Sequence, residues 1–411
     1  MSKTSFQNIL QKEITRKEFL SFSVFAVASI FGIVGLIREL ASRAATPTAS
    51  AEAEAGTVSA PATKVTDTQA SGSQAVKFGT VAPGDGFVLG VTEPNATNTG
   101  VPDSKIFAAA DIITTDITIT TVGTVIDGKE IHACITVKAA NVTIKNCRII
   151  GPQSAPANRP LIYHIDAAVS NFRLERCTVR PTLTSASTDT LMGHSITRIR
   201  NNISRGVDGS GSYINPAFGT NCNYLVQGDY IHDLAYYCPT TTQGDNHTHN
   251  DGNQQHNGTN VTFEGVAIHG YWDPNVGDGS VPGTFQTDPT TGKVTCLSGN
   301  CNDNYGTVKG RRNVNATFQI AQVTGGITDD FHIINSWVYG GASTINILDT
   351  KLAMTKFEIR GNRFEVPMYG RNAIINANSA SSAIIQCSGN TYMDTGLPML
   401  GTVGNGRQNK V

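Results

Sequence analysis

The chain has 411 residues, which is enough for one large domain or two ordinary ones. Glycine accounts for 41 residues and charged residues for only 15%, a mixture more typical of short strands joined by tight turns than of helices. The formal net charge of −1 argues against nucleic acid as a partner, because phosphate binding needs a basic surface.

The first segment, 1–51, is predicted to be a signal sequence or a membrane anchor. Phe19–Ile37 is a run of uncharged, mostly apolar residues, and basic residues such as Lys12 and Arg16 precede it. A helix of this length nearly matches the hydrocarbon thickness of a bilayer. Ala49–Ala51 offers a small-x-small cleavage site. The sequence therefore predicts an exported protein, either secreted or tethered at the cell surface by this segment, and leaves cleavage open.

Residues 52–104 are predicted to form a linker, since they are rich in Ala, Thr, Ser, Gly and Pro. Within them, Glu52–Gly79 resembles the opening of a carbohydrate-binding β-sandwich module. The stretch is far shorter than a whole sandwich, so we interpret it as a remnant of such a module. The last residues, 401–411, are expected to be a tail.

From about residue 105 an eight-residue unit recurs, first seen as Val142–Ile149. Its first, third and eighth positions are apolar or aromatic in all but one of the repeats, and Arg198 is the exception. Positions one and three alternate with polar residues, as a half-buried strand requires. The sixth position is occupied by mostly small or polar residues that can stack at a turn: Cys147, Cys177, Asn201, Asp229, Val266, Ser336, Asn362 and Asn390.

The spacing of this repeat predicts an all-β fold, a right-handed parallel β-helix over 105–400. Successive steps are 30, 24, 28, 37, 70, 26 and 28 residues, which suits three short strands per coil better than the four-stranded blade of a propeller. The step of 70 is expected to contain an insertion near 272–312 and one further coil at Ala316–Val323. Stacked coils bury a continuous interior that one coil alone cannot bury.

The same region resembles the pectate-lyase-like superfamily, and within it a bacterial group of right-handed β-helix repeat proteins. The motifs that carry the resemblance are His249–Gln254, Asn335–Gly341, and Asn362–Phe364 followed by Tyr369–Gly370. The resemblance implies the coil architecture and an extracellular polysaccharide as partner. It does not imply one reaction, because many activities share these coils.

A dense cluster of titratable residues between two coils is the candidate site. Five of the nine histidines fall within 232–256. The residues proposed for catalysis are Asp251, His249, Asp233 and His232, and those proposed for substrate binding are Tyr237, Gln254, Trp272 and Arg311. Titratable groups at close range on a rigid wall are what acid–base chemistry requires.

Two kinds of polysaccharide cleavage fit these residues. A glycoside hydrolase would use two carboxyl groups, Asp251 with Asp233, Asp245 or Glu264. A lyase would use a base such as His249 or His232, and a cation to stabilise the developing charge. That cation would be Arg311 with its basic neighbours, or Ca²⁺.

Two other interpretations also remain open. Histidines 232, 247 and 249 could bind a metal, although the sequence does not identify one. Alternatively, the polar cluster belongs to turns, and the protein is a non-catalytic surface adhesin that binds glycans. In each reading the protein is expected to be a monomer.

Overall fold

The computed structural model describes most of the chain from residue 86 onward. The described residues are 63–66, 74–77, 86–209, 211–213, 221–237, 240–241, 248–277, 284–287, 294–298, 307–308, 311–312, 314–321, 328–341, 343–347, 356–365, 374–376, 385–399 and 406–408. Contacts divide the chain into two units, Met1–Asp85 and Gly86–Val411. In the first unit, β1 (Thr63–Thr66) pairs with β2 (Gln74–Lys77) in an antiparallel hairpin. The predicted N-terminal helix lies outside the described residues, and no described helix is long and apolar enough to cross a membrane.

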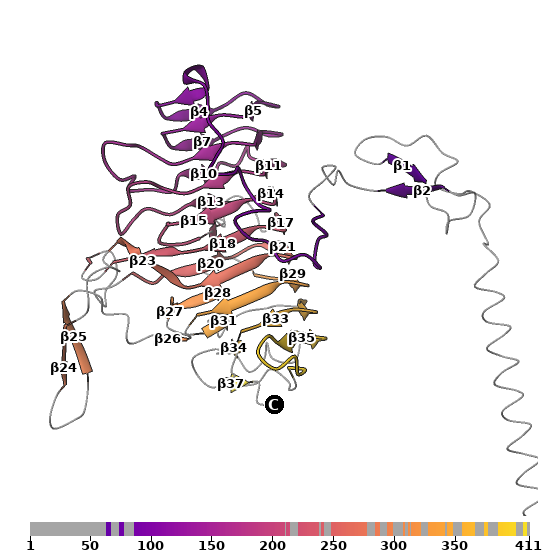
Figure 1. The fold of residues 1–411 in the computed structure, drawn as a ribbon, viewed down its shortest axis with the longest axis vertical. Coiled ribbons are helices and arrows are strands. Elements are labelled where there is room, and N and C mark those ends of the chain that lie inside the picture. Colours follow the sequence, from indigo (N-terminus) through magenta and orange to yellow (C-terminus); the bar gives the residue numbers. More distant parts are fainter. Residues whose placement is uncertain are drawn as a thin grey trace, which may run out of the picture. The chain divides into compact units, whose positions relative to one another are not determined.

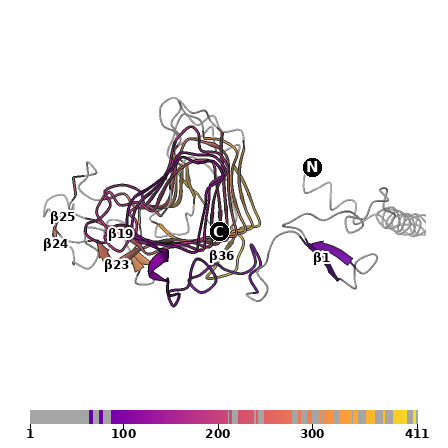
Figure 2. The same cartoon turned by 90° about the horizontal axis from the view of Figure 1, so that it is seen from above.

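The second unit is a parallel β-helix in which each coil contributes a strand to each of three sheets, as Figures 1 and 2 show. Seen from above, the coils superpose around one interior (Figure 2). Sheet 1 has ten strands, all parallel except the last. They are β4 (Ile117–Ile119), β7 (Ile135–Val137), β10 (Ile162–His164), β13 (Leu191–Gly193), β16 (Gly211–Tyr213), β20 (Asp251–His256), β28 (Ala316–Ala321), β31 (Ser343–Ile347), β34 (Ile374–Asn376) and β37 (Gly406–Gln408).

Sheets 2 and 3 complete each coil. Sheet 2 is formed by β5 (Val125–Asp127), β8 (Thr143–Lys145), β11 (Phe172–Glu175), β14 (Ile196–Ile199), β17 (Asn221–Gln227), β21 (Thr259–Glu264), β29 (Phe331–Ile334), β32 (Phe357–Arg360) and β35 (Ile385–Ser388). Sheet 3 is formed by β3 (Ile112–Ile113), β6 (Glu130–Ile131), β9 (Arg148–Ile149), β12 (Thr178–Val179), β15 (Asn202–Ser204), β18 (Tyr230–His232), β22 (Ala267–Gly270), β30 (Trp337–Gly340), β33 (Arg363–Phe364) and β36 (Thr391–Tyr392).

The sequence repeat corresponds to the corner between sheets 2 and 3. Its first position stacks in register, for example Phe172 on Ile196 and Phe331 on Phe357, and these side chains are buried in one core. Phe331 and Phe357 stack with ring centroids 5.1 Å apart. The apolar columns of the sequence are therefore the interior columns of the β-helix.

The sixth position forms a hydrogen-bonded ladder at the same corner. The backbone N–H of Asn362 donates to Asn390 Oδ1 at 2.9 Å, and that of Ser336 donates to Asn362 Oδ1 at 2.9 Å. The residue just before the sixth position has a positive φ, which bends the chain there; Asn335 has a φ of 50° and Gly361 a φ of 66°. The polar column predicted to stack is confirmed, and it satisfies backbone groups that the turn leaves unpaired.

One element of the predicted coil pattern, the further coil at Ala316–Val323, is wrong. Its described part, Ala316–Ala321, is strand β28 of sheet 1, and strand β21 pairs directly with β29 in sheet 2. The long step is a single coil whose connection from sheet 3 to sheet 1 is enlarged. That connection contains β23 (Trp272–Gly277), β24 (Thr284–Thr287), β25 (Val294–Ser298), β26 (Thr307–Val308) and β27 (Arg311–Arg312).

Residues 86–107, here called the strap, run along the outside of sheet 3. Arg363 Nη2 donates to Gly90 O at 3.4 Å at one end, and Arg148 Nη2 donates to Pro102 O at 2.9 Å at the other. Between them, the N–H of Val101 donates to Thr178 Oγ1 at 2.9 Å. The strap then leads through a short 3-10 turn, η3 (Ala109–Asp111), into the first coil.

Candidate functional site

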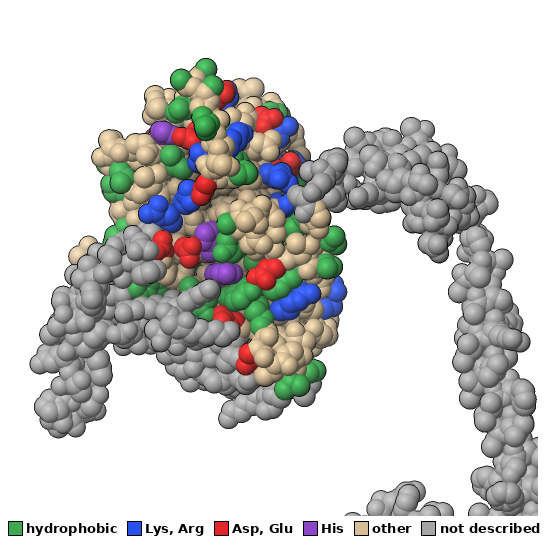
Figure 3. Space-filling view, viewed as in Figure 1, with side chains coloured by type: hydrophobic (Ala, Val, Ile, Leu, Met, Phe, Trp, Pro, Cys, Tyr) green, Lys and Arg blue, Asp and Glu red, His purple; other side chains and the backbone are tan. Residues whose placement is uncertain are grey.

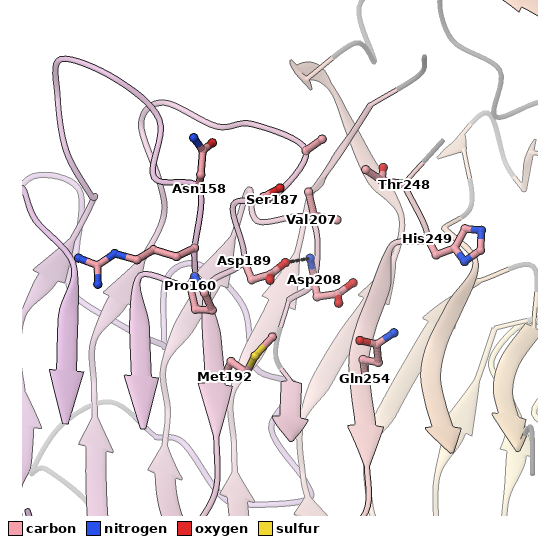
Figure 4. A pocket seen from close by; sticks show the side chains of 12 residues that line it. Asn158, Pro160, Ser187, Asp189, Met192, Val207, Asp208, Thr248, His249 and Gln254 are labelled. Atoms are coloured by element: carbon pink, nitrogen blue, oxygen red, sulfur yellow. Dashed lines mark hydrogen bonds between the residues drawn. The ribbon is translucent and has the colours of Figure 1, made fainter. Parts of the chain in front are cut away.

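The connections from sheet 3 to sheet 1 vary in length and include the longest of the coils. A pocket of about 390 Å³ lies among those that follow β9, β12, β15 and β18. It is lined by Asn158, Arg159, Pro160, Ala186, Ser187, Asp189, Met192, Val207, Asp208, Thr248, His249 and Gln254. These residues come from successive coils, so the pocket exists only because the coils stack. Figure 4 shows the carboxyl group of Asp189 against the backbone N–H of Asp208.

Three aspartates on consecutive coils form a hydrogen-bonded ladder at this pocket, and each coil is one rung of it. The backbone N–H of Asp208 donates to Asp189 Oδ1 at 3.3 Å, and that of Asp251 donates to Asp208 Oδ1 at 2.9 Å. Each aspartate lies at or just before the start of a sheet 1 strand. The sheet therefore fixes the order and the approximate spacing of the carboxyl groups.

The innermost member, Asp251, is fully buried. Its Oδ1 accepts hydrogen bonds from Asn315 Nδ2 at 3.1 Å and from the N–H of Ala316 at 3.0 Å, and its Oδ2 accepts one from Gln254 Nε2 at 3.4 Å. Burial nevertheless raises the pKa of Asp251 well above its usual range. Asp251 does not line the pocket itself, and it lies on the coil that follows Asp208.

The two members of the ladder that line the pocket, Asp189 and Asp208, both have raised pKa values. Burial raises the pKa of Asp189 to about 6, against a lowering effect of the Asp208 N–H. Burial also raises the pKa of Asp208 well above the usual range, and the charges of Asp189 and Asp251 add to that rise. Because two neighbouring carboxylates repel each other, such a pair holds a proton at a higher pH than isolated aspartates do. One protonated and one ionised carboxyl group are the usual arrangement for acid and base roles.

Of the predicted site residues, His249 and Gln254 line this pocket and Asp251 supports it. The Asp208 carboxyl group points toward Gln254, whereas the imidazole of His249 points away from both aspartates (Figure 4). Tyr237 lies close by, since its hydroxyl is 2.6 Å from Thr184 Oγ1 and its N–H donates to Thr248 Oγ1 at 3.1 Å.

His232 and Asp233 do not line the pocket. His232 is the last residue of a sheet 3 strand, where its Nδ1 is 2.6 Å from Asp233 Oδ2 and its Nε2 is 3.0 Å from Asn202 Oδ1. Its ring also stacks on Tyr230 with centroids 4.0 Å apart. Asp233 has a positive φ of 49°, so it occupies a corner of the coil.

The remaining two predicted residues are not placed at the pocket either. Trp272 is only 4% exposed and stacks on Tyr236, which indicates packing under the insertion. The backbone of Arg311 lies in β27, and its side chain is outside the described part of the chain, as are Asp245 and His247.

Asp189 and Asp208 were missed by the sequence prediction. They lie 19 residues apart, and Asp208 lies 43 residues before Asp251, because connections of different length separate the strands. One feature of the sequence could have identified them. In successive coils an aspartate occurs at the start of the sheet 1 strand or up to three residues before it.

Cations and metal ligands are sparse among the described residues of the site. The one lining cation that the structure describes is Arg159, and it forms an ion pair with Asp116. No cluster of three or more potential metal ligands occurs within the described residues. Over the visible described surface, acidic and basic side chains are interspersed (Figure 3).

Comparison with known proteins adds no assignment to this geometry. No protein-family model, curated protein or solved structure matches the chain.

Proposed function

We propose that the protein is a glycoside hydrolase of extracellular polysaccharide, with Asp189 and Asp208 as its catalytic pair. The observation that carries the proposal is the placement of both carboxyl groups on adjacent rungs of one pocket. A protonated carboxyl group can donate to the glycosidic oxygen while an ionised one assists attack at the anomeric carbon. Burial raises the pKa of both groups, so the pair can hold the proton that the acid must donate.

Hydrolysis fits the described pocket better than elimination does. A lyase must stabilise the charge that develops beside a uronate carboxylate, which requires a metal ion or a cationic side chain. Arg159, the lining cation described above, is already paired with Asp116. Two carboxyl groups with raised pKa values instead match the requirement for general acid catalysis at neutral pH.

The wider setting is part of the same proposal. The predicted leader and linker support export, with the β-helix held outside the cell. The motif resemblance supports a right-handed β-helix of the pectate-lyase-like superfamily. A polysaccharide is then the substrate that a long, rigid, laterally open wall is suited to bind.

A non-catalytic glycan-binding adhesin is the second candidate, and one observation favours it. Asp251 is fully buried and accepts three hydrogen bonds, which is also how an aspartate with a purely structural role at a coil corner would be bound. In that case the ladder would be a device for satisfying backbone N–H groups.

Incubation of the full-length protein with a panel of neutral and acidic polysaccharides distinguishes these functions. Reducing ends are measured for bond cleavage, and absorbance at about 235 nm is measured for the unsaturated uronate that a lyase forms. We expect reducing ends without new absorbance. New absorbance would indicate a lyase, and binding to a polysaccharide without any product would indicate the adhesin.

A further inference from the structure

We propose that the pocket takes the end of a polysaccharide chain, because a hydrogen-bonded arch closes the side of the pocket that is remote from sheet 1. The arch is the contact between the side chains of Thr184 and Tyr237. The inference rests on the proposed function, and it specifies which part of the substrate the site accepts.

The arch joins two connections that are not neighbours. Thr184 lies between β12 and β13, and Tyr237 lies between β18 and β20. The connection from β15 to β16 belongs to the coil between them. Thr184 Oγ1 and the Tyr237 hydroxyl oxygen are nevertheless 2.6 Å apart. Because strands of adjacent coils are about 4.8 Å apart, these two side chains together span the width of the middle coil.

The middle connection, which carries Asp208, lies beneath the arch. It is the shortest of the three connections. The N–H of Val207 donates to Thr188 O at 2.8 Å, and the N–H of Ala235 donates to Gly206 O at 2.8 Å. The middle connection is therefore held between the two longer ones, which reach past it and meet at the arch.

The arch adjoins the side of the pocket opposite the sheet. In Figure 4, Met192 and Gln254 project from strands of sheet 1 at one side of the pocket, and Ser187 and Thr248 lie at the other, with the two aspartates between. Ser187 belongs to the same connection as one end of the arch. Thr248 Oγ1 accepts the N–H of Tyr237, the other end, at 3.1 Å.

A second contact extends this closed side toward the N-terminal coils. Ser185 Oγ donates to Asn158 Oδ1 at 2.7 Å, and Asn158 lines the pocket from the connection between β9 and β10. Hydrogen bonds thus link all four connections that surround the pocket. They form a continuous wall on the side remote from sheet 1.

This wall determines how a long substrate can lie. A polysaccharide that is cut in its middle must extend from the catalytic groups in two directions. Here the chain can leave only across the outer face of sheet 1, from which Met192 and Gln254 project. The pocket volume of about 390 Å³ is near the lower end of the usual range for small-molecule sites, roughly 300–1,000 Å³. It fits a few sugar units at a chain end.

The sizes of the products made by the unmodified full chain test the inference. Reducing ends, viscosity and product length are measured together on each polysaccharide of the panel that is cleaved. We expect short products and little fall in viscosity. A rapid fall in viscosity early in the reaction would overturn cleavage at chain ends and leave the proposed hydrolysis standing. An absence of reducing ends from every substrate would overturn both.

A variant tests the arch itself. Tyr237→Ala should open the wall, so that viscosity falls several-fold more per reducing end released than with the parent. The matched control is Tyr339→Ala, because Tyr339 is also half-buried and bonded through its hydroxyl, to Glu93, but lies on sheet 3 and does not line the pocket. The control should keep the product sizes of the parent.

Circular dichroism establishes that each variant is folded. If Tyr237→Ala does not fold, Tyr237→Phe replaces it, since this change keeps the ring and removes only the bond to Thr184. A folded variant at Tyr237 with the same product sizes and viscosity change as the parent would show that the arch does not restrict the substrate.

Discussion

Replacing Arg198 by methionine should destabilise the β-helix strongly, because Arg198 is one half of a buried ion pair. Its side chain is fully buried in an interior column, where its Nε donates to Asp229 Oδ2 at 2.7 Å and its Nη1 donates to the Tyr224 hydroxyl at 3.2 Å. Asp229 is also fully buried. Methionine fills the volume but leaves the Asp229 carboxylate without its counter-charge.

The expected loss is about 3 to 5 kcal/mol in the free energy of unfolding, the usual cost of removing one partner of a buried ion pair. Burial raises the pKa of Asp229 and the charge of Arg198 opposes that rise. Without Arg198 the pKa of Asp229 rises further, so its carboxyl group stays protonated up to a higher pH than in the parent. The penalty is therefore largest at high pH and shrinks as the pH falls.

Urea denaturation of the full chain at several pH values, followed by circular dichroism, measures this effect. The matched control is Arg173→Met, which removes a half-exposed arginine of the same sheet from its ion pair with Glu175 and should cost less than about 1 kcal/mol. The double variant Arg198→Met/Asp229→Asn should recover at least half of the loss. A cost for Arg198→Met no larger than that of the control would refute the reasoning.

Three further predictions concern the strap, the corner ladder and the pocket. Gly100→Ala should lower the free energy of unfolding, measured by urea denaturation, by about 1 to 3 kcal/mol. The φ of Gly100 is +63°, and an added Cβ would lie 2.5 Å from a buried hydroxyl oxygen. Gly123→Ala is the control, because Gly123 has a similar φ but open space around it, and it should cost less. Asn362→Leu should cost about 2 to 5 kcal/mol in the same assay, because it leaves the Ser336 N–H unpaired. A loss under about 1 kcal/mol would contradict a stabilising role for the ladder at the corner between sheets 2 and 3. Burial raises the pKa of Asp189 to about 6, above its ordinary value. The unfolding free energy of the parent relative to Asp189→Asn should therefore be highest below pH ~4 and fall as the pH rises through ~6. A pH-independent difference would contradict this.

Most of the fold could be predicted because a stacked coil repeats its constraints along the chain. A buried strand position must be apolar in every coil, so Phe172, Ile196 and Phe331 mark the same column without any contact information. Arg198 broke the column in sequence, and the structure explains it by the buried partner Asp229 in the polar corner column. A buried column can accept a charged residue when the neighbouring column supplies the opposite charge. The sequence alone does not show which residues of two columns are paired in this way.

The pocket was harder to predict because its spacing is not repeated. Asp189 and Asp208 follow connections of unequal length, so no fixed interval joins them to Asp251. The prediction followed the histidine-rich stretch instead, and of the residues predicted there only His249 and Gln254 line the pocket. The same variability of the connections led to the incorrect extra coil at Ala316–Ala321.

The central claim is that the Asp189–Asp208 pair catalyses glycoside hydrolysis, and initial rates of reducing-end release test it most directly. The comparison is between the parent, Asp208→Asn and the control Asp329→Asn. Asp329 accepts the N–H of Lys356 at 2.9 Å, again a bond to the next coil, but it does not line the pocket. We predict a loss of about 100-fold or more for Asp208→Asn and a nearly unchanged rate for Asp329→Asn. Equal rates in all three proteins would contradict the account.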